Sequence, residues 1–254
     1  MARHGRPGES PLGESIELSV IAPVFNEAGG VIELAREICA VLDGRSFELI
    51  FVDDASRDET RAVLSGLRRE LPHLRLVGHR RNAGQSRALH SGVLAARAPI
   101  IATLDGDGQN DPADIPKLLR QFQRLDAPHR LAMVAGERCK REDSRVKLWT
   151  SRVANAVRRR VLGDGARDSA CGLRIIRRDA FLQMPYFDHM HRYLPALLRR
   201  DGWKVEFCEV NHRPRRHGRS KYDTLGRLRA SIRDLLGVMW LLARARDPIG
   251  VDEL

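Results

Sequence analysis

The sequence lacks several features that would place it in common classes of protein. It has only 4 cysteines in 254 residues, and none of them forms a Cys-x-x-Cys pair. This spacing argues against a zinc finger and a disulfide scaffold, and we expect reduced thiols. No apolar run approaches the ~20 residues that a membrane-spanning helix needs. The N-terminal residues lack the apolar segment of a signal peptide, so we expect a loose tail there.

Aromatic residues are also scarce, at 5% of the chain, and the 33 acidic residues are outnumbered by 44 basic ones. The resulting net charge of +11 favours an anionic partner, which could be nucleic acid, an acidic membrane surface or a phosphorylated substrate. Because aromatic side chains for base stacking are few and no recognition motif stands out, we expect no nucleic-acid partner. The hydrophobic share of 43% suffices for one large α/β domain or two small ones.

Short apolar runs alternate with helical patterns through the first half of the chain. Five runs predict buried strands, at 18–22, 47–52, 74–77, 99–104 and 131–135. Helical spacing predicts helices between them, at 31–42, 56–70, 84–96 and 112–125, the second of which would begin with a capping box formed by Ser56 and Glu59. This alternation predicts a mainly parallel sheet covered by helices on both faces. Further on, the pattern predicts helices at 147–162 and 223–244 and strands at 173–176 and 205–210.

Acidic residues follow the predicted strands where each strand ends. Asp53 and Asp54 follow the second strand, and Asp105 and Asp107 follow the fourth. Ligands of parallel sheets bind at the carboxyl ends of the strands, so we expect these carboxylates to share one site. Carboxylate oxygens suit Mg²⁺ or Mn²⁺, and Mg²⁺ typically arrives with substrate phosphates. The alternative for the second pair is a solvated Asp-Gly turn.

Eight motifs occur in a fixed order along the chain. They are Ala22-Pro23-Val24-Phe25-Asn26-Glu27, Val52-Asp53-Asp54-Ala55-Ser56, Asn82-Ala83-Gly84, Asp105-Gly106-Asp107-Gly108-Gln109, Ala135-Gly136-Glu137-Arg138, Asp168 with Cys171-Gly172-Leu173-Arg174, His191-Arg192-Tyr193-Leu194-Pro195, and Arg215 with Gly218-Arg219-Ser220-Lys221-Tyr222. Together they resemble family 2 glycosyltransferases of the GT-A fold. Within that family they resemble the dolichol-phosphate mannose synthase and polyprenyl-phosphate glycosyltransferase group, from about Leu18 to Leu241.

The resemblance implies a fold and a division of the chain. It implies a Rossmann-like α/β fold with a mainly parallel central sheet, C-terminal acceptor-binding elements and a terminal amphipathic helix. We expect a single domain over 15–244 between tails at 1–14 and 245–254. Within it, 15–136 would bind the nucleotide sugar, 137–222 would bind the acceptor, and 223–244 would form the last helix.

The resemblance also implies roles for individual residues. Positions that cradle the nucleotide are matched by Pro23, Phe25, Glu27, Val52, Asp54 and Asp105. Asp54 would accept a hydrogen bond from the base, either from uracil N3–H or from guanine N1–H and N2–H. The metal positions are matched by Asp105, Asp107 and Gln109, for a Mg²⁺ or Mn²⁺ cofactor.

Four further residues, Arg138, Lys147, Ser151 and Arg215, match positions that receive the phosphate of the acceptor. Lys147 and Ser151 lie one helical turn apart and can face the same anion. Related enzymes mostly have arginine where this chain has Lys147, and lysine supplies charge without the bidentate fork. For Asp168, Cys171 and His191 we expect structural roles, with Asp168 tying the loop before Cys171 to the sheet.

The activity implied is the inverting transfer of a sugar from a nucleoside diphosphate sugar, such as GDP-mannose or a UDP-hexose, to a polyprenyl or dolichyl phosphate. Such an acceptor is already anionic near pH 7 and needs no strong general base. The alternative within the family is a soluble transferase that acts on a glycan or small-molecule hydroxyl, which would need a carboxylate base. A nucleotidyltransferase and a protein that only binds its ligand are further alternatives.

The last predicted helix bears on the membrane. Its best apolar stretch, Leu235–Ala243, is flanked by charged residues and is too short to span a bilayer. We expect the helix either to pack on the domain or to contact anionic lipid. Each basic residue at an anionic membrane surface contributes about 1 kcal/mol of binding free energy. The expected location is therefore cytoplasmic, peripheral to the cytoplasmic face of a membrane, without a transmembrane helix.

Overall fold

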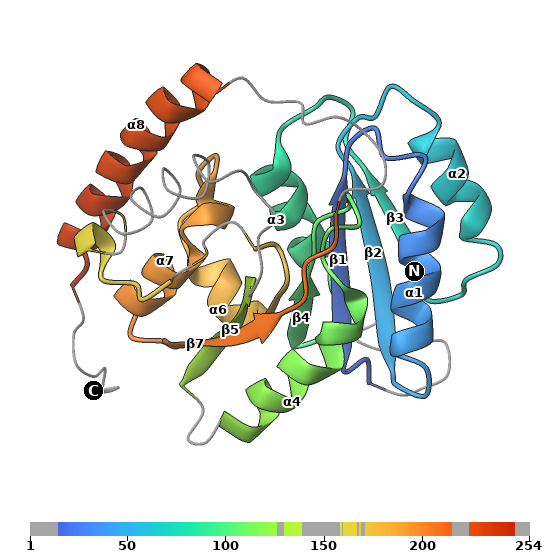
Figure 1. The fold of residues 1–254 in the computed structure, drawn as a ribbon, viewed down its shortest axis with the longest axis horizontal. Coiled ribbons are helices and arrows are strands. Elements are labelled where there is room, and N and C mark those ends of the chain that lie inside the picture. The colour runs from blue at the N-terminus through green and yellow to red at the C-terminus, as the bar shows by residue number, and fades with distance from the viewer. Residues whose placement is uncertain are drawn as a thin grey trace, which may run out of the picture.

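The computed structural model describes residues 15–125, 130–138, 158, 160–166, 168, 171–214 and 224–246. Its centre is a seven-stranded sheet in the order β3-β2-β1-β4-β6-β5-β7 (Figure 1). The strands are β1 (Leu18–Val24), β2 (Phe47–Asp53), β3 (Leu74–Gly78), β4 (Ile100–Thr103), β5 (Leu131–Arg138), β6 (Arg174–Arg177) and β7 (Lys204–Val210). Only β6 is antiparallel to its neighbours, β4 and β5. The other six strands therefore end at one edge of the sheet, where β6 begins.

Helices cover both faces of this sheet. They are α1 (Val31–Val41), α2 (Thr60–Leu67), α3 (Gln85–Ala95), α4 (Ile115–Leu125), α6 (Arg178–Gln183), α7 (Leu194–Arg200) and α8 (Thr224–Ala243), with 3-10 turns η1 (Pro112–Asp114) and η2 (Met190–Arg192). Side chains on a strand alternate between the faces. In β2, Phe47, Leu49 and Phe51 join the apolar cluster beneath α1, α2 and α4, whereas Ile50 and Val52 join the cluster beneath α3, α6 and α7.

The architecture confirms the predicted fold class, because all seven predicted strands form and six share one direction. The start of α2 was predicted wrongly. The Ser56 hydroxyl accepts the backbone N–H of Asn26 at 2.9 Å instead of capping the helix, and the N–H of Thr60 donates to Asp58 at 3.0 Å. The short helices α6 and α7 were not predicted. Of the helix expected at 147–162, residues 158 and 160–162 are described and are helical; the expected tails lie largely outside the described residues.

Helix α8 contacts the rest of the protein through one face. Val238 is 1% exposed, and Leu235, Leu241 and Leu242 pack against the cluster beneath α7. An ion pair of 2.8 Å joins Asp234 to His189, just before η2. Within the part of the chain that is described, no helix has both the length and the apolar character needed to cross a bilayer.

The packing of α3 on the sheet depends on a glycine. A Cβ atom at Gly92 would lie 2.4 Å from Cγ2 of Ile21 in β1 and 3.0 Å from Cγ2 of Val52 in β2. Both neighbours are fully buried and have no room to retreat. The missing side chain is therefore what lets α3 approach the sheet this closely.

We predict that Gly92→Ala lowers the free energy of unfolding by about 1–3 kcal/mol, because the added methyl group overpacks a filled core. Gly66→Ala is the matched control. Gly66 is also helical, in α2, but an added Cβ there meets nothing within 4 Å. Its higher helix propensity should raise stability by up to about 1 kcal/mol. Urea unfolding measures the free energy of unfolding of both variants. An equal change in the two would contradict the close approach of α3 to the sheet at Gly92.

Candidate active site

The edge of the sheet where the six parallel strands end carries most of the residues that the sequence analysis selected. Nine of them are described: Pro23, Phe25, Glu27, Val52, Asp54, Asp105, Asp107, Gln109 and Arg138. They come from the ends of β1, β2 and β5 and from the loop that follows β4. The three remaining acceptor residues, Lys147, Ser151 and Arg215, lie outside the described residues.

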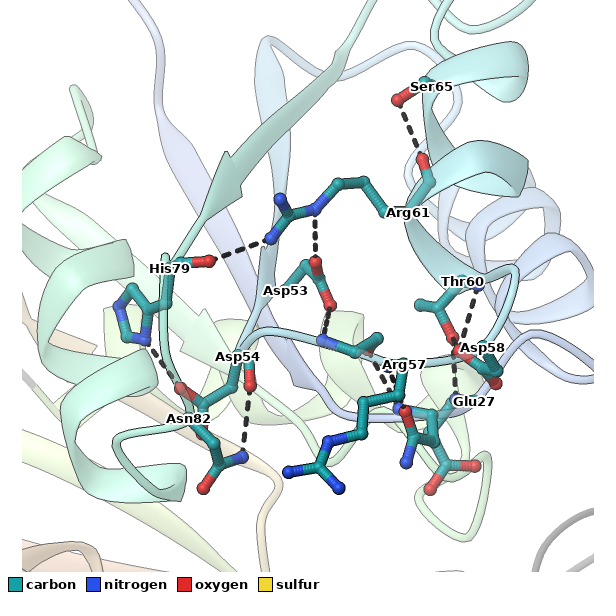
Figure 2. Close-up of polar contacts among 12 residues, drawn as sticks. Glu27, Asp53, Asp54, Arg57, Asp58, Thr60, Arg61, Ser65, His79 and Asn82 are labelled. Carbon is teal, nitrogen blue, oxygen red and sulfur yellow. Dashed lines mark hydrogen bonds and ion pairs between the residues drawn. The ribbon is translucent and has the colours of Figure 1, made fainter.

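The loops after β1 and β2 are joined by hydrogen bonds between side chains and backbone (Figure 2). The N–H of Arg57 donates to the side-chain oxygen of Asn26 at 2.7 Å, and the N–H of Glu27 donates to the hydroxyl of Thr60 at 2.9 Å. Asn26 has a φ of 55°, a left-handed conformation that asparagine tolerates better than most residues. These bonds fix the backbone on which Glu27 is presented.

The two neighbouring aspartates at the end of β2 have different surroundings. Asp53 is fully buried, and its carboxylate accepts the N–H of Ser56 at 3.0 Å and Nε of Arg61 at 2.6 Å. Arg61 also donates to the backbone oxygen of His79 at 2.9 Å. Asp53 therefore ties the turn after β2 to α2 and, through Arg61, to the end of β3.

Asp54 organises the loop between β3 and α3. Its Oδ1 accepts Nδ1 of His79 at 2.6 Å and the N–H of Ala83 at 2.9 Å, and its Oδ2 accepts the N–H of Gly84 at 2.8 Å. Its backbone oxygen accepts the side-chain amide of Asn82 at 3.0 Å (Figure 2). Gly84 has a φ of 85°, which a residue with a side chain rarely adopts. Three of the about four acceptor positions of the Asp54 carboxylate are thus in use.

Asp105 lies in the loop after β4 and is close to another part of that loop, to α3 and to the segment before β6. Its Oδ1 accepts Nε2 of Gln85, the first residue of α3, at 2.7 Å, and its N–H donates to Asn110 at 2.8 Å. A Cβ atom at Gly172, just before β6, would lie 2.4 Å from the Asp105 carboxylate. Glycine at 172 therefore makes room for the acid.

The pKa of Asp105 is raised to about 6, first by burial and then by the negative charge of Asp107, while the charges of Arg174 and Arg138 oppose the rise. The two carboxylates are therefore close enough to interact. The backbone between them is not extended, because the chain turns at Gly106 and Asp107.

Asp107 and Gln109 lie on the same turn. The N–H of Gln109 donates to Oδ1 of Asp107 at 3.1 Å, and the side-chain amide of Gln109 lies 3.5 Å from Nε2 of His212. Arg213 holds this loop against α1 through Glu37 at 2.6 Å and Asp111 at 2.7 Å.

In the described ranges, no group of three or more His, Cys, Asp and Glu side chains is placed to hold a metal ion. Two carboxylates and one amide oxygen nevertheless fit Mg²⁺, which usually binds through one or two carboxylates together with substrate phosphates.

Two arginines, Arg138 and Arg174, lie near Asp105 and Asp168. Arg138, at the end of β5, donates through Nε and Nη2 to both carboxylate oxygens of Asp168, at 2.5 and 2.8 Å. This fork ties the segment of Asp168 to the sheet, as expected. Arg174, the first residue of β6, is buried; burial lowers its pKa, and the charges of Cys171, Asp105 and Asp168 act against that change.

Two residues from the quoted motifs have structural surroundings. His191 is half-buried with Nδ1 2.7 Å from the hydroxyl of Ser86, and its pKa is lowered to about 3 by desolvation and by the charges of Arg174 and Arg192. Burial raises the pKa of the Cys171 thiol to about 11. A neutral histidine and an unreactive thiol agree with the structural roles expected for both.

Sequence reasoning gave no role to Gln85, His79 or Arg174, although Gln85 and Arg174 lie in or next to a selected motif and His79 lies three residues before one. Gln85 directly follows Asn82-Ala83-Gly84, and Arg174 ends Cys171-Gly172-Leu173-Arg174. Their partners, Asp105 and Asp54, are distant in sequence. The only available signal was therefore their position beside a motif.

Comparisons with known proteins identify the family of the chain. A family model described as Glycosyl transferase family 2 matches residues 19–184. The dodecaprenyl-phosphate galacturonate synthase of Rhizobium johnstonii is 35% identical over 238 residues, which cover 90% of this chain and 68% of the relative. The undecaprenyl-phosphate 4-deoxy-4-formamido-L-arabinose transferase of Pseudomonas aeruginosa is 34% identical over 214 residues, 82% of this chain and 61% of the relative. The chain thus spans about two thirds or less of the length of these relatives.

Solved structures show the same fold at low identity. Glucosyl-3-phosphoglycerate synthase from Mycobacterium tuberculosis, in complex with Mn²⁺, UDP and glucosyl-3-phosphoglycerate, superposes with a TM-score of 0.66 at 20% identity, covering 97% of this chain and 88% of that one. This similarity supports the GT-A architecture. By its fold and by the family model that spans most of its sheet, the chain belongs to glycosyl transferase family 2.

Proposed function

We propose that this chain catalyses the inverting transfer of a sugar from a nucleoside diphosphate sugar to a polyprenyl phosphate. The observation that carries the proposal is the convergence of Asp54, Asp105, Asp107 and Arg138 on one edge of the sheet. The names of the two curated relatives, both polyprenyl-phosphate sugar enzymes, support the acceptor class.

The nucleotide would bind between the ends of β1 and β2, where Pro23, Phe25, Glu27 and Val52 surround Asp54. Asp105 and Asp107, with the amide oxygen of Gln109, would hold Mg²⁺ or Mn²⁺ beside the diphosphate. The mutual repulsion that raises the pKa of Asp105 would be relieved by a bound cation. When bound, the metal supplies Lewis-acid stabilisation of the departing diphosphate. The Mn²⁺ complex of the structural neighbour supports a divalent ion.

The acceptor phosphate would approach from the side of Arg138, with Lys147, Ser151 and Arg215 as further contacts. Its oxygen is already a nucleophile, so the task of the protein is to align it with the anomeric carbon and to balance charge. A hydroxyl acceptor would instead need a free carboxylate base. Around the site, Asp54 accepts three hydrogen bonds and Asp168 is forked to Arg138, which favours the phosphate.

We predict that Asp107→Asn abolishes sugar transfer, by at least 100-fold in kcat/KM (about 3 kcal/mol of transition-state stabilisation), because the metal position loses a charge. The melting temperature should stay close to that of the wild type. Asp43→Asn, an exposed carboxylate far from the site in the α1–β2 loop, is the control. Transfer is measured as a radiolabelled, organic-extractable product in Mn²⁺ buffer; near-normal turnover of the Asp107 variant would contradict the mechanism.

The hydrogen bonds of Asp54 favour uracil as the base of the donor. Oδ1 already accepts two donors and Oδ2 accepts one, which leaves one open acceptor position. Uracil would offer Asp54 one donor, N3–H, whereas guanine would offer two, N1–H and N2–H. A guanine would therefore keep one N–H without a partner, at a cost of about 1–3 kcal/mol.

We predict that UDP binds at least tenfold more tightly than GDP in the presence of Mn²⁺, which isothermal titration calorimetry measures. His79→Ala removes one donor from Oδ1 and should narrow the preference, because a second acceptor position opens. Tighter binding of GDP would overturn the choice of base but leave the transferase proposal intact. Binding of neither nucleotide would count against both.

We further propose that α8 rests on an anionic membrane surface, where a polyprenyl phosphate would be found. Four apolar side chains form a stripe on its outer face: Ile232, Leu236, Met239 and Trp240, which are 54%, 60%, 40% and 59% exposed. Their spacing of four, seven and eight places them on one side of the helix, away from buried Val238. Exposed Arg233 and Arg244 beside this stripe complement anionic lipid.

We predict that the protein floats with vesicles containing phosphatidylglycerol and that Leu236→Glu with Trp240→Glu reduces this binding at least tenfold. The control is Leu94→Glu on α3, which is similarly exposed at 57% but lies outside the stripe. An unchanged bound fraction in the α8 variant would show that this face does not contact the bilayer.

A further inference from the structure

A wide hollow lies at the edge of the sheet opposite to the candidate active site. It has a volume of about 650 Å³ and is bounded by the loop at 44–46, the start of β2, the segment 72–76 and Arg97. These segments precede β2, β3 and β4. The hollow is within the size range of small-molecule sites and shares no residue with the edge that carries Asp54 and Asp105.

Its walls are strongly basic. The lining includes Arg45, Arg68, Arg75 and Arg97 together with His73, and among the described lining residues Glu48 alone is acidic. Four guanidinium groups around one hollow repel each other unless an anion or a carboxylate lies between them.

Glu48 compensates only one of the four guanidinium groups, that of Arg75. It is buried and accepts the hydroxyl of Ser19 at 2.6 Å and the backbone N–H of Arg97 at 2.7 Å, and it is paired with Arg75. The guanidinium groups of Arg45, Arg68 and Arg97 have no hydrogen bond or ion pair with any described residue. Among the described residues, three positive charges thus have no partner carboxylate.

The C-termini of nearby helices offset only part of this positive charge. Helices α1, α2 and α3 all end at this edge, and each C-terminus carries about half a negative charge, which favours a nearby arginine. Three ends would offset about half of three guanidinium charges. An excess of positive charge remains in a hollow rather than on an open surface.

The remaining lining includes a flat ring surface and two leucines. The ring of His73 stacks on Phe47 with centroids 4.4 Å apart and planes at 19°, and Leu74 and Leu76 line the same hollow. Guanidinium forks match phosphate oxygens in geometry and charge. We propose that this hollow binds the phosphate group of a small ligand through Arg45, Arg68 and Arg97, independently of the transferase site.

The test is titration calorimetry with inorganic pyrophosphate at 0.15 M salt in the presence of EDTA, which suppresses metal-dependent binding at the carboxyl edge. The test variant is Arg68→Ser with Arg97→Ser, and the control is Arg120→Ser with Arg124→Ser, which removes the same charge from exposed positions on α4. We expect at least a tenfold loss of affinity in the test variant and less than a twofold loss in the control. The melting temperatures of both variants verify folding, since all four side chains are exposed.

Equal losses in the two variants would reduce the effect to net charge and overturn the proposal, as would absence of pyrophosphate binding by the wild type. A second arm identifies the source of the phosphate. Vesicles containing phosphatidic acid are floated with the same variants. Reduced flotation of the Arg68 and Arg97 variant alone would support a lipid headgroup, and unchanged flotation with weakened pyrophosphate binding would support a soluble phosphorylated ligand.

Discussion

The site depends most on the hydrogen bonds that the Asp54 carboxylate accepts. By accepting the N–H groups of Ala83 and Gly84, this carboxylate fixes the turn that begins α3. The next residue, Gln85, then reaches Asp105 at 2.7 Å. The proposed base-binding end and the proposed metal-binding end of the donor site are thus connected through three consecutive residues. A shift of Asp54 would move both ends together.

The single antiparallel strand connects the second half of the chain to this arrangement. Because β6 runs against its neighbours, it begins at the edge where β4 and β5 end, so Gly172 and Arg174 lie beside Asp105 and Arg138. A parallel strand at this position would begin at the opposite edge and place the positive charge of Arg174 far from the acids. The charge balance around Asp105 therefore follows from the topology.

Periodicity was sufficient to predict the strands and the acids that follow them, because a buried strand has to end where charged residues begin. It could not predict the start of α2, because the Ser56 hydroxyl accepts a hydrogen bond from the backbone N–H of Asn26, 30 residues away, and does not cap the helix. The partnership of Gln85 with Asp105 was equally hidden, since it depends on how α3 is seated on the sheet. The roles of Lys147, Ser151 and Arg215 rest on resemblance alone and stay predictions.

The two edges of the sheet differ in how their charges are balanced, and this difference has a physical origin. In an α/β sheet, helices begin near the carboxyl edge and end near the amino edge, so the helix dipoles favour anions at the first edge and arginines at the second. At the carboxyl edge, the acids follow this preference, and the charges of Arg138 and Arg174 offset them further. At the amino edge, Glu48 is already satisfied by its neighbours, so the arginines around it remain available to a ligand. The same topology that builds the donor site thus leaves a basic hollow on the other side of the sheet.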